Sequence, residues 1–84
     1  MGAREMMTAW VLEALRSRDG SATILEISKE IWRRHEEEIR GTGDLMYEWQ
    51  YEMRWAGDLL RRQGVLSPAR DTPRGTWRIA EPGS

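Results

Sequence analysis

The sequence predicts an α+β fold in which three helices are followed by a two-stranded antiparallel hairpin. Apolar residues recur every three or four positions in three long segments, and each segment ends close to a glycine. The last part of the chain changes to short segments of strand character around a loop with two prolines and a glycine. With 84 residues, the chain is expected to form one domain over residues 1–84.

The first helix is predicted over residues 4–18. Its apolar side chains share one stripe and its charged side chains lie elsewhere; the stripe consists of Met7, Trp10, Val11, Ala14 and Leu15. Asp19 and Gly20 should end the helix, because glycine adopts the left-handed conformation after a helix without steric strain. Residues 21–23 follow as a polar link that forms at most a small strand.

The second helix is predicted over residues 24–40. Thr23 and Glu26 fit a capping box, in which each side chain accepts a hydrogen bond from the backbone of the other residue. The expected inward face consists of Ile24, Ile27, Ile31, His35 and Ile39. A Gly-Thr-Gly sequence at residues 41–43 should break this helix.

The third helix is predicted over residues 45–63, with Asp44 as its N-cap. Its inward stripe should contain Leu45, Trp49, Met53, Ala56, Leu60 and Gln63. Of the other tryptophans, Trp10 and Trp77 are expected in the core, and Trp55 is expected to cover the seam between this helix and the hairpin.

The hairpin is predicted over residues 65–79, and residues 80–84 should form a tail. Trp77 and Ile79 share one face of its second strand. Because an isolated hairpin is marginally stable in water, it should pack on the helices. This order of elements is that of a winged helix-turn-helix, in which the third helix enters the DNA major groove and the hairpin is the wing.

Residues 53–79 also resemble the winged-helix domain at the N-terminus of Mrr-type restriction endonucleases. The resemblance rests on Met53-Arg54-Trp55-Ala56, Leu60, Gly64-Val65-Leu66 and Arg74-Gly75-Thr76-Trp77-Arg78-Ile79. It implies a winged-helix DNA-binding module. Family members often have a basic residue where this chain has Glu52, so that DNA contact is not carried over. Because the chain ends at Ser84, no nuclease domain is expected, and nuclease activity is not implied.

The charge distribution favours DNA more than the net charge of −1 indicates. The first 44 residues contain seven basic and nine acidic side chains. Residues 54–78 instead contain six arginines and two aspartates, a local balance of +4. Positive charge is therefore expected on the second half of the third helix and on the wing.

Eight residues on these elements are the candidate DNA contacts. They are Tyr47, Gln50, Tyr51, Arg54, Arg61, Arg62, Arg70 and Arg74. Guanidinium groups fit phosphate oxygens or the O6 and N7 atoms of guanine, and the other side chains can hydrogen-bond bases or phosphates. Arginine in a loop with proline and glycine suits contact with the DNA backbone or minor groove. The alternative is an ordinary solvated helix face, on which Arg54 and Arg61 pair with Asp58.

Catalytic, metal and cofactor sites are not expected. The chain has no cysteine, which excludes disulfides, thiolate nucleophiles and Cys-based zinc sites. His35 is the only histidine and should pack beside the core, and the consecutive glutamates at residues 36–38 diverge around the helix. There is no glycine-rich phosphate loop or paired-histidine motif. We therefore expect no enzyme activity and no small-molecule substrate.

A cytoplasmic protein without a membrane partner is expected, since no apolar run approaches the length of a membrane span and residues 1–5 lack a signal-peptide pattern.

The predicted function is that of a small DNA-binding regulator of transcription or accessory factor, with double-stranded DNA as its partner. The alternative is a winged-helix module that binds a protein and no DNA, which Glu48, Glu52 and Asp58 on the third helix would suit. A homodimer formed through the first helix or Trp32 is a third possibility.

Overall fold

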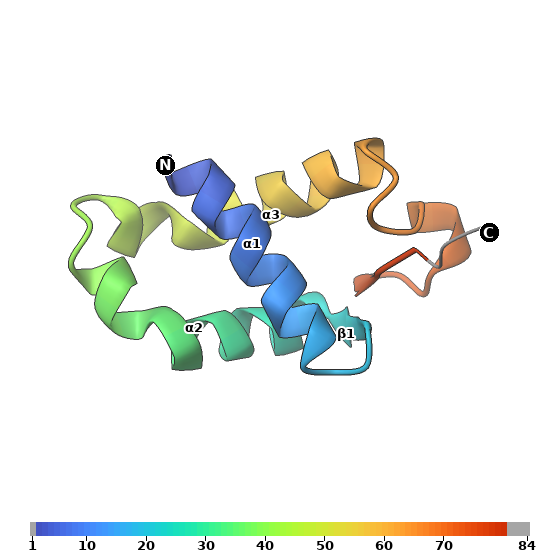
Figure 1. Cartoon of the computed structure of the whole chain (residues 1–84), viewed down its shortest axis with the longest axis horizontal. Coiled ribbons are helices and arrows are strands. Elements are labelled where there is room, and N and C mark those ends of the chain that lie inside the picture. The colour runs from blue at the N-terminus through green and yellow to red at the C-terminus, as the bar shows by residue number, and fades with distance from the viewer. Residues whose placement is uncertain (1, 81–84) are drawn as a thin grey trace.

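The computed structural model describes residues 2–80, which form three helices and a two-stranded antiparallel sheet (Figure 1). In chain order the elements are α1 (Ala3–Arg16), β1 (Ser21–Thr23), α2 (Ile24–Arg40), α3 (Leu45–Arg62), the short 3₁₀ helix η1 (Ala69–Asp71) and β2 (Thr76–Arg78). The prediction of an α+β fold with three helices is confirmed. None of the described helices is long and apolar enough to cross a membrane.

The sheet differs from the predicted hairpin in its partner strand. β2 pairs with β1, so that Ala22 lies opposite Trp77, and the polar link predicted over residues 21–23 is a strand. Residues 65–67 contribute an isolated bridge between Leu66 and Ile79. Pro68 follows this bridge and has no backbone N–H, so pairing does not extend toward the loop.

The core lies where α1 crosses α2 and α3 (Figure 1). Every residue of the predicted stripe of α1 is buried, as are the inward residues of α3 apart from Gln63, which is exposed. Trp10, Trp49 and Trp77 are buried, as predicted. Burial of these large apolar side chains is the main source of stability in a domain of this size.

Trp55 does not lie at the seam between α3 and β2, so that prediction was wrong. Its ring lines a groove between α1 and α3, where the Arg4 guanidinium carbon lies 4.3 Å from the ring centroid. The surface of α3 opposite Thr76–Arg78 is taken instead by Gly57, over which Trp77 lies.

The helix ends follow the predicted chemistry at one terminus and depart from it at two others. The capping box of α2 is present: Thr23 N donates to Glu26 Oε1 at 2.9 Å, and Glu26 N donates to Thr23 Oγ1 at 3.1 Å. Asp44 is the N-cap residue of α3, as predicted, but its backbone is already helical and its side chain makes no capping hydrogen bond. α1 ends at Arg16, two residues earlier than predicted: Arg18 N donates to Leu15 O in a tighter turn, and Asp19 (φ 60°) and Gly20 (φ 87°) follow in the left-handed region.

The end of the described chain is tied to the residues after α3. Ala80 N donates to Val65 O at 2.9 Å, and Ser67 N donates to Arg78 O at 2.8 Å. The remainder of the predicted tail, residues 81–84, lies outside the described residues.

Candidate nucleic-acid interface

The outward face of α3 carries five of the eight candidate DNA contacts. Leu45, Trp49, Met53, Ala56 and Leu60 bury the opposite face, which turns the positions between them to solvent. The exposed fraction of Tyr47 is 88% and that of Tyr51 is 68%. Gln50, Arg54 and Arg62 are also exposed. The prediction that Tyr47, Tyr51, Arg54 and Arg62 face outward is therefore confirmed, and Gln50 is exposed as well.

Arg54 stands out among these residues because its charge is not neutralised locally. Within residues 2–80, no carboxylate lies within 4.0 Å of its guanidinium group. The same holds for Arg70 on η1 and Arg74 in the loop that precedes β2, and both are exposed. These three arginines can therefore meet an external anion without first breaking an ion pair.

Arg61 has a different place from the one predicted. Its Nη2 donates to Thr76 O at 3.0 Å, its side chain is half-buried, and its Nε is buried without a partner among the described residues. The guanidinium thus bridges α3 and β2. Arg61 therefore does not lie on the exposed face beside Arg54, because its guanidinium group is hydrogen-bonded to Thr76 O of β2.

Arg62, rather than Arg54 or Arg61, pairs with Asp58, with Nη2 3.0 Å from Oδ2. The alternative pairing considered from the sequence was therefore wrong. An acidic residue four positions before a basic residue is the favoured order on a helix, which suits Arg62 and not Arg54. Because both side chains are exposed, such a pair contributes ~0–1 kcal/mol and its arginine can exchange partners.

The carboxylate of Glu52 is not placed to repel an anion that binds to the outward face of α3. Its side chain is 13% exposed, and its Oε2 accepts from Arg4 Nε of α1 at 3.0 Å. The carboxylate is thus neutralised on the flank of α3 that contacts α1, away from Tyr51 and Arg54.

The loop between η1 and β2 is held close to the start of α2. Ile24 N donates to Gly75 O at 2.8 Å, and Arg78 Nη2 donates to Asp71 O at 3.1 Å. Gly75 has φ 76°, which allows the turn after Arg74 without Cβ strain. These bonds place Arg74 next to the N-terminus of α2, on an anchored turn.

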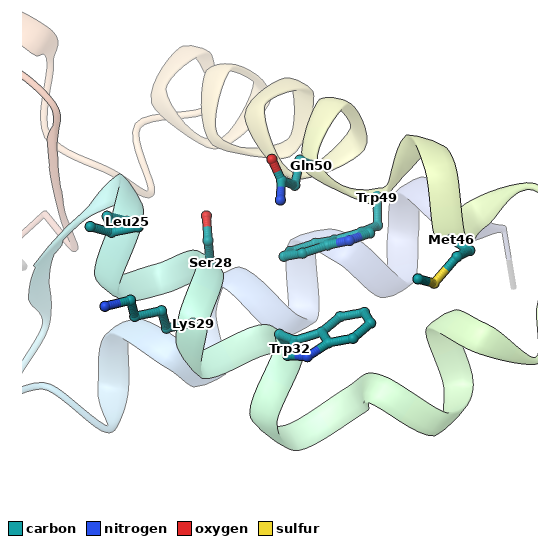
Figure 2. A pocket seen from close by; sticks show the side chains of 7 residues that line it. All are labelled: Leu25, Ser28, Lys29, Trp32, Met46, Trp49 and Gln50. Carbon is teal, nitrogen blue, oxygen red and sulfur yellow. The ribbon is translucent and has the colours of Figure 1, made fainter.

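Two residues of α2 that are not among the eight predicted DNA contacts line the same groove as Gln50. Leu25, which is 63% exposed, and Lys29 line an open groove between α2 and α3 with a volume of about 360 Å³ (Figure 2). The other side chains of the groove are Ser28, Trp32, Met46 and Trp49. The signal was available in the sequence, since Leu25, Lys29 and Trp32 are spaced four and three apart and therefore share a helix face.

Two carboxyl groups of α2, Glu26 and Glu30, have lowered pKa values. Hydrogen bonds from the Thr23 backbone and hydroxyl lower the pKa of Glu26, and the Arg33 guanidinium, which pairs with it, lowers the pKa of Glu30. Within residues 2–80 no three acidic or histidine side chains converge in a way that could hold a metal ion.

His35 packs as part of the structure. Its ring stacks on Trp10 with centroids 4.1 Å apart, Nε2 lies 2.7 Å from Glu13 Oε1 and Nδ1 lies 3.0 Å from Glu38 Oε2. The backbone of α2 departs from helical geometry at this residue (φ −128°). All its ring contacts are therefore internal, which leaves no nitrogen directed at an outside ligand.

Comparison of the chain with family models, with curated proteins and with solved structures finds no match.

Proposed function

We propose that this protein is a DNA-binding winged-helix module that acts as a regulator or accessory factor. The order of helices and strands is compatible with that fold, and the strand of β2 lies between β1 and Leu66, which suits a small wing sheet. The resemblance of residues 53–79 to the Mrr-type winged helix supports the same assignment. The observation that carries the proposal is the exposed, unneutralised arginine set Arg54, Arg70 and Arg74.

In the proposed complex, the outward face of α3 enters the major groove. Gln50 and Arg54 are one helical turn apart, so both can reach base edges, where glutamine suits adenine and arginine suits guanine. Tyr47 and Tyr51 lie on the same exposed face and can donate their hydroxyl groups to phosphates. Arg70 and Arg74 rest on the DNA backbone beside the groove.

Lys29 extends this surface onto α2. It is exposed, and no carboxylate lies within 4.0 Å of it among the described residues. Together with Arg70 and Arg74 it gives three cations available for phosphates, beside Arg54 at the bases. A log–log slope of affinity against salt of about −3 is therefore expected.

The experiment is a titration of the ¹⁵N-labelled protein with a mixed-sequence duplex at low and moderate salt. The proposal expects amide shifts at residues 47–54 and 70–75, together with weakening by salt at the slope above. Arg40, at the far end of α2 and paired with Glu36 at 2.8 Å, provides a control region whose amide should not move. Unchanged amide chemical shifts of Arg54 and Arg74, even at low salt, would refute the proposal.

A second candidate is a winged-helix module that binds a protein. The observation in its favour is the aromatic surface of Tyr47 and Tyr51, since exposed tyrosines are typical of protein-binding hot spots. Binding of DNA with a slope near zero, or no binding of DNA, would favour this candidate. Salt-insensitive association with a protein partner through these tyrosines would establish it.

A further inference from the structure

The groove between α2 and α3 has the composition of a small-ligand site. Its walls are mainly apolar, and its volume of about 360 Å³ falls within the range of sites that hold small organic molecules. Figure 2 shows the side chains of Trp32 and Trp49 next to one another, with Met46 at one end of the groove and Leu25 at the other. Ligand pockets of this kind pair an apolar surface with a few polar groups that fix orientation.

The two indoles supply a surface for an aromatic ring. The rings of Trp32 and Trp49 are stacked, with centroids 5.9 Å apart and planes 22° apart. Trp49 is buried and Trp32 is half-buried, so the pair is held in place while part of the Trp32 side chain remains open to solvent. A further aromatic ring can pack against the open part of this pair in an offset-stacked or edge-to-face arrangement.

The charge of the groove selects an anion. None of its lining residues is acidic, and Lys29 is its only charged residue. Lys29 is also the only lysine in the sequence, and it has no carboxylate within 4.0 Å in the described part of the chain. Arg33, one turn along α2, differs in that it is paired with Glu30. Lys29 adds to the hydrogen bonds from Thr23 in lowering the pKa of Glu26 but makes no ion pair with it, so its ammonium group can still meet an anion at the edge of an aromatic surface.

We infer that this groove binds a small aromatic carboxylate, with the ring against Trp32 and Trp49 and the carboxylate on Lys29. Gln50 stands across the groove on α3 and can donate its amide N–H to the second carboxylate oxygen. The groove would bind such a molecule without transforming it. This inference goes beyond the proposed function and does not require that the protein bind DNA.

The test uses 2-naphthoate and its uncharged analogue 2-naphthamide as probes of the full chain labelled with ¹⁵N. The indole N–H signals of Trp32 and Trp49 and the amides of Leu25, Lys29 and Gln50 should shift together. For a probe of this size in an open groove, a Kd on the order of 1 mM is expected. Naphthamide should bind roughly three- to fivefold more weakly, which is the effect of one exposed ion pair.

Two exposed positions separate charge from packing without disturbing the core. Lys29→Gln should remove the preference for naphthoate over naphthamide, and Arg33→Gln should retain it. Leu25→Glu should weaken naphthoate more than naphthamide, because it places a carboxylate beside the anion, while Leu25→Gln should affect both probes alike. Thermal unfolding of each variant verifies that the fold is intact.

Equal binding of the two probes, or shifts centred on the α1–α3 groove around Trp55 instead, would overturn the inference. So would concentration-dependent self-association that shifts the Trp32 indole signal without any probe, since the groove would then be covered by a second copy of the chain. Sedimentation velocity over the concentrations used for the titration decides that point.

Discussion

Trp77 of β2 packs directly over Gly57 of α3, in the space that a side chain at position 57 would occupy. A Cβ atom built at Gly57 would lie 2.8 Å from Cζ3 of Trp77 and nearer still to Cζ2 and Cη2 of the same ring. Trp77 is buried and its backbone is held in the sheet opposite Ala22. The glycine therefore sets how closely β2 can approach α3.

Gly57→Ala should destabilise the protein although alanine favours helices by about 1 kcal/mol over glycine. Because the ring of Trp77 is enclosed, overpacking should outweigh the helix propensity and lower the free energy of unfolding by about 1–3 kcal/mol. Urea unfolding followed by circular dichroism measures this change.

A double-mutant cycle provides the control for Gly57. In a Trp77→Phe background the smaller ring leaves room for the methyl group, so Gly57→Ala should become neutral or stabilising. An equal loss of stability in both backgrounds would show that the contact with Trp77 is not the cause.

The capping box of α2 should make stability depend on pH. Because the pKa of Glu26 is lowered in the folded protein, its carboxylate stabilises the fold fully above its ordinary value of 4.5, and this stabilisation is lost as the pH falls below it. The melting temperatures of wild type and Glu26→Gln should therefore converge between pH 7 and pH 3. Glutamine retains an acceptor for Thr23 N, so Glu26→Ala should melt lower than Glu26→Gln at pH 7.

Thr23→Ala tests the other half of the same box. Loss of the hydroxyl that accepts from Glu26 N should reduce the free energy of unfolding by about 1 kcal/mol, and Thr23→Ser should retain it. A reduction as large in Thr23→Ser would indicate that packing of the threonine methyl group, and not the cap, is responsible.

Under the proposed function, Arg54 and Asp58 should have opposite effects on DNA affinity. Arg54→Gln removes the proposed guanine contact and should reduce affinity for a duplex that offers this base by ~1–3 kcal/mol. Asp58→Asn removes an acidic group from the same face and releases Arg62, so it should raise affinity. Fluorescence anisotropy of a labelled duplex across a salt series measures both, with Arg40→Gln as the variant that should leave the affinity unchanged.

Substitution of Arg61 should change the stability of the protein and leave its DNA affinity unchanged. Arg61→Met keeps the apolar stem and removes the hydrogen bond to Thr76 O together with the buried unpaired Nε, so the free energy of unfolding should fall by no more than about 1 kcal/mol. The salt slope of DNA binding should remain that of the wild type. A smaller salt slope of DNA binding with unchanged stability would instead indicate that Arg61 contacts DNA.

Features set by neighbouring residues could be predicted from the sequence. The helical segments, the buried stripe of α1 and the capping box of Thr23 depend on contacts within four positions, which periodicity and cap chemistry describe. The exposure of Tyr47, Tyr51 and Arg54 follows from the same periodicity, once the inward face of α3 is known.

Features that depend on contacts between distant segments could not be predicted from the sequence. Residues 65–67 do pair with the strand at Arg78–Ala80, but residues 21–23 pair along its other edge, and local strand character does not reveal that second pairing. Arg61 and Arg62 are adjacent in sequence, yet the carbonyl of Thr76 takes one and Asp58 takes the other. Gly57 showed no local signal of its role, because the ring that requires it comes from β2.

The pairing of β1 with β2 has a consequence for synthesis of the protein. β1 leaves the ribosome early, but its partner emerges only after α2 and α3, so closing the sheet means closing a loop that contains both helices. Until then the edge of β1 is open and the surface of α3 at Gly57 is uncovered. Arrested nascent chains should therefore become resistant to protease only once Ile79 has cleared the exit tunnel.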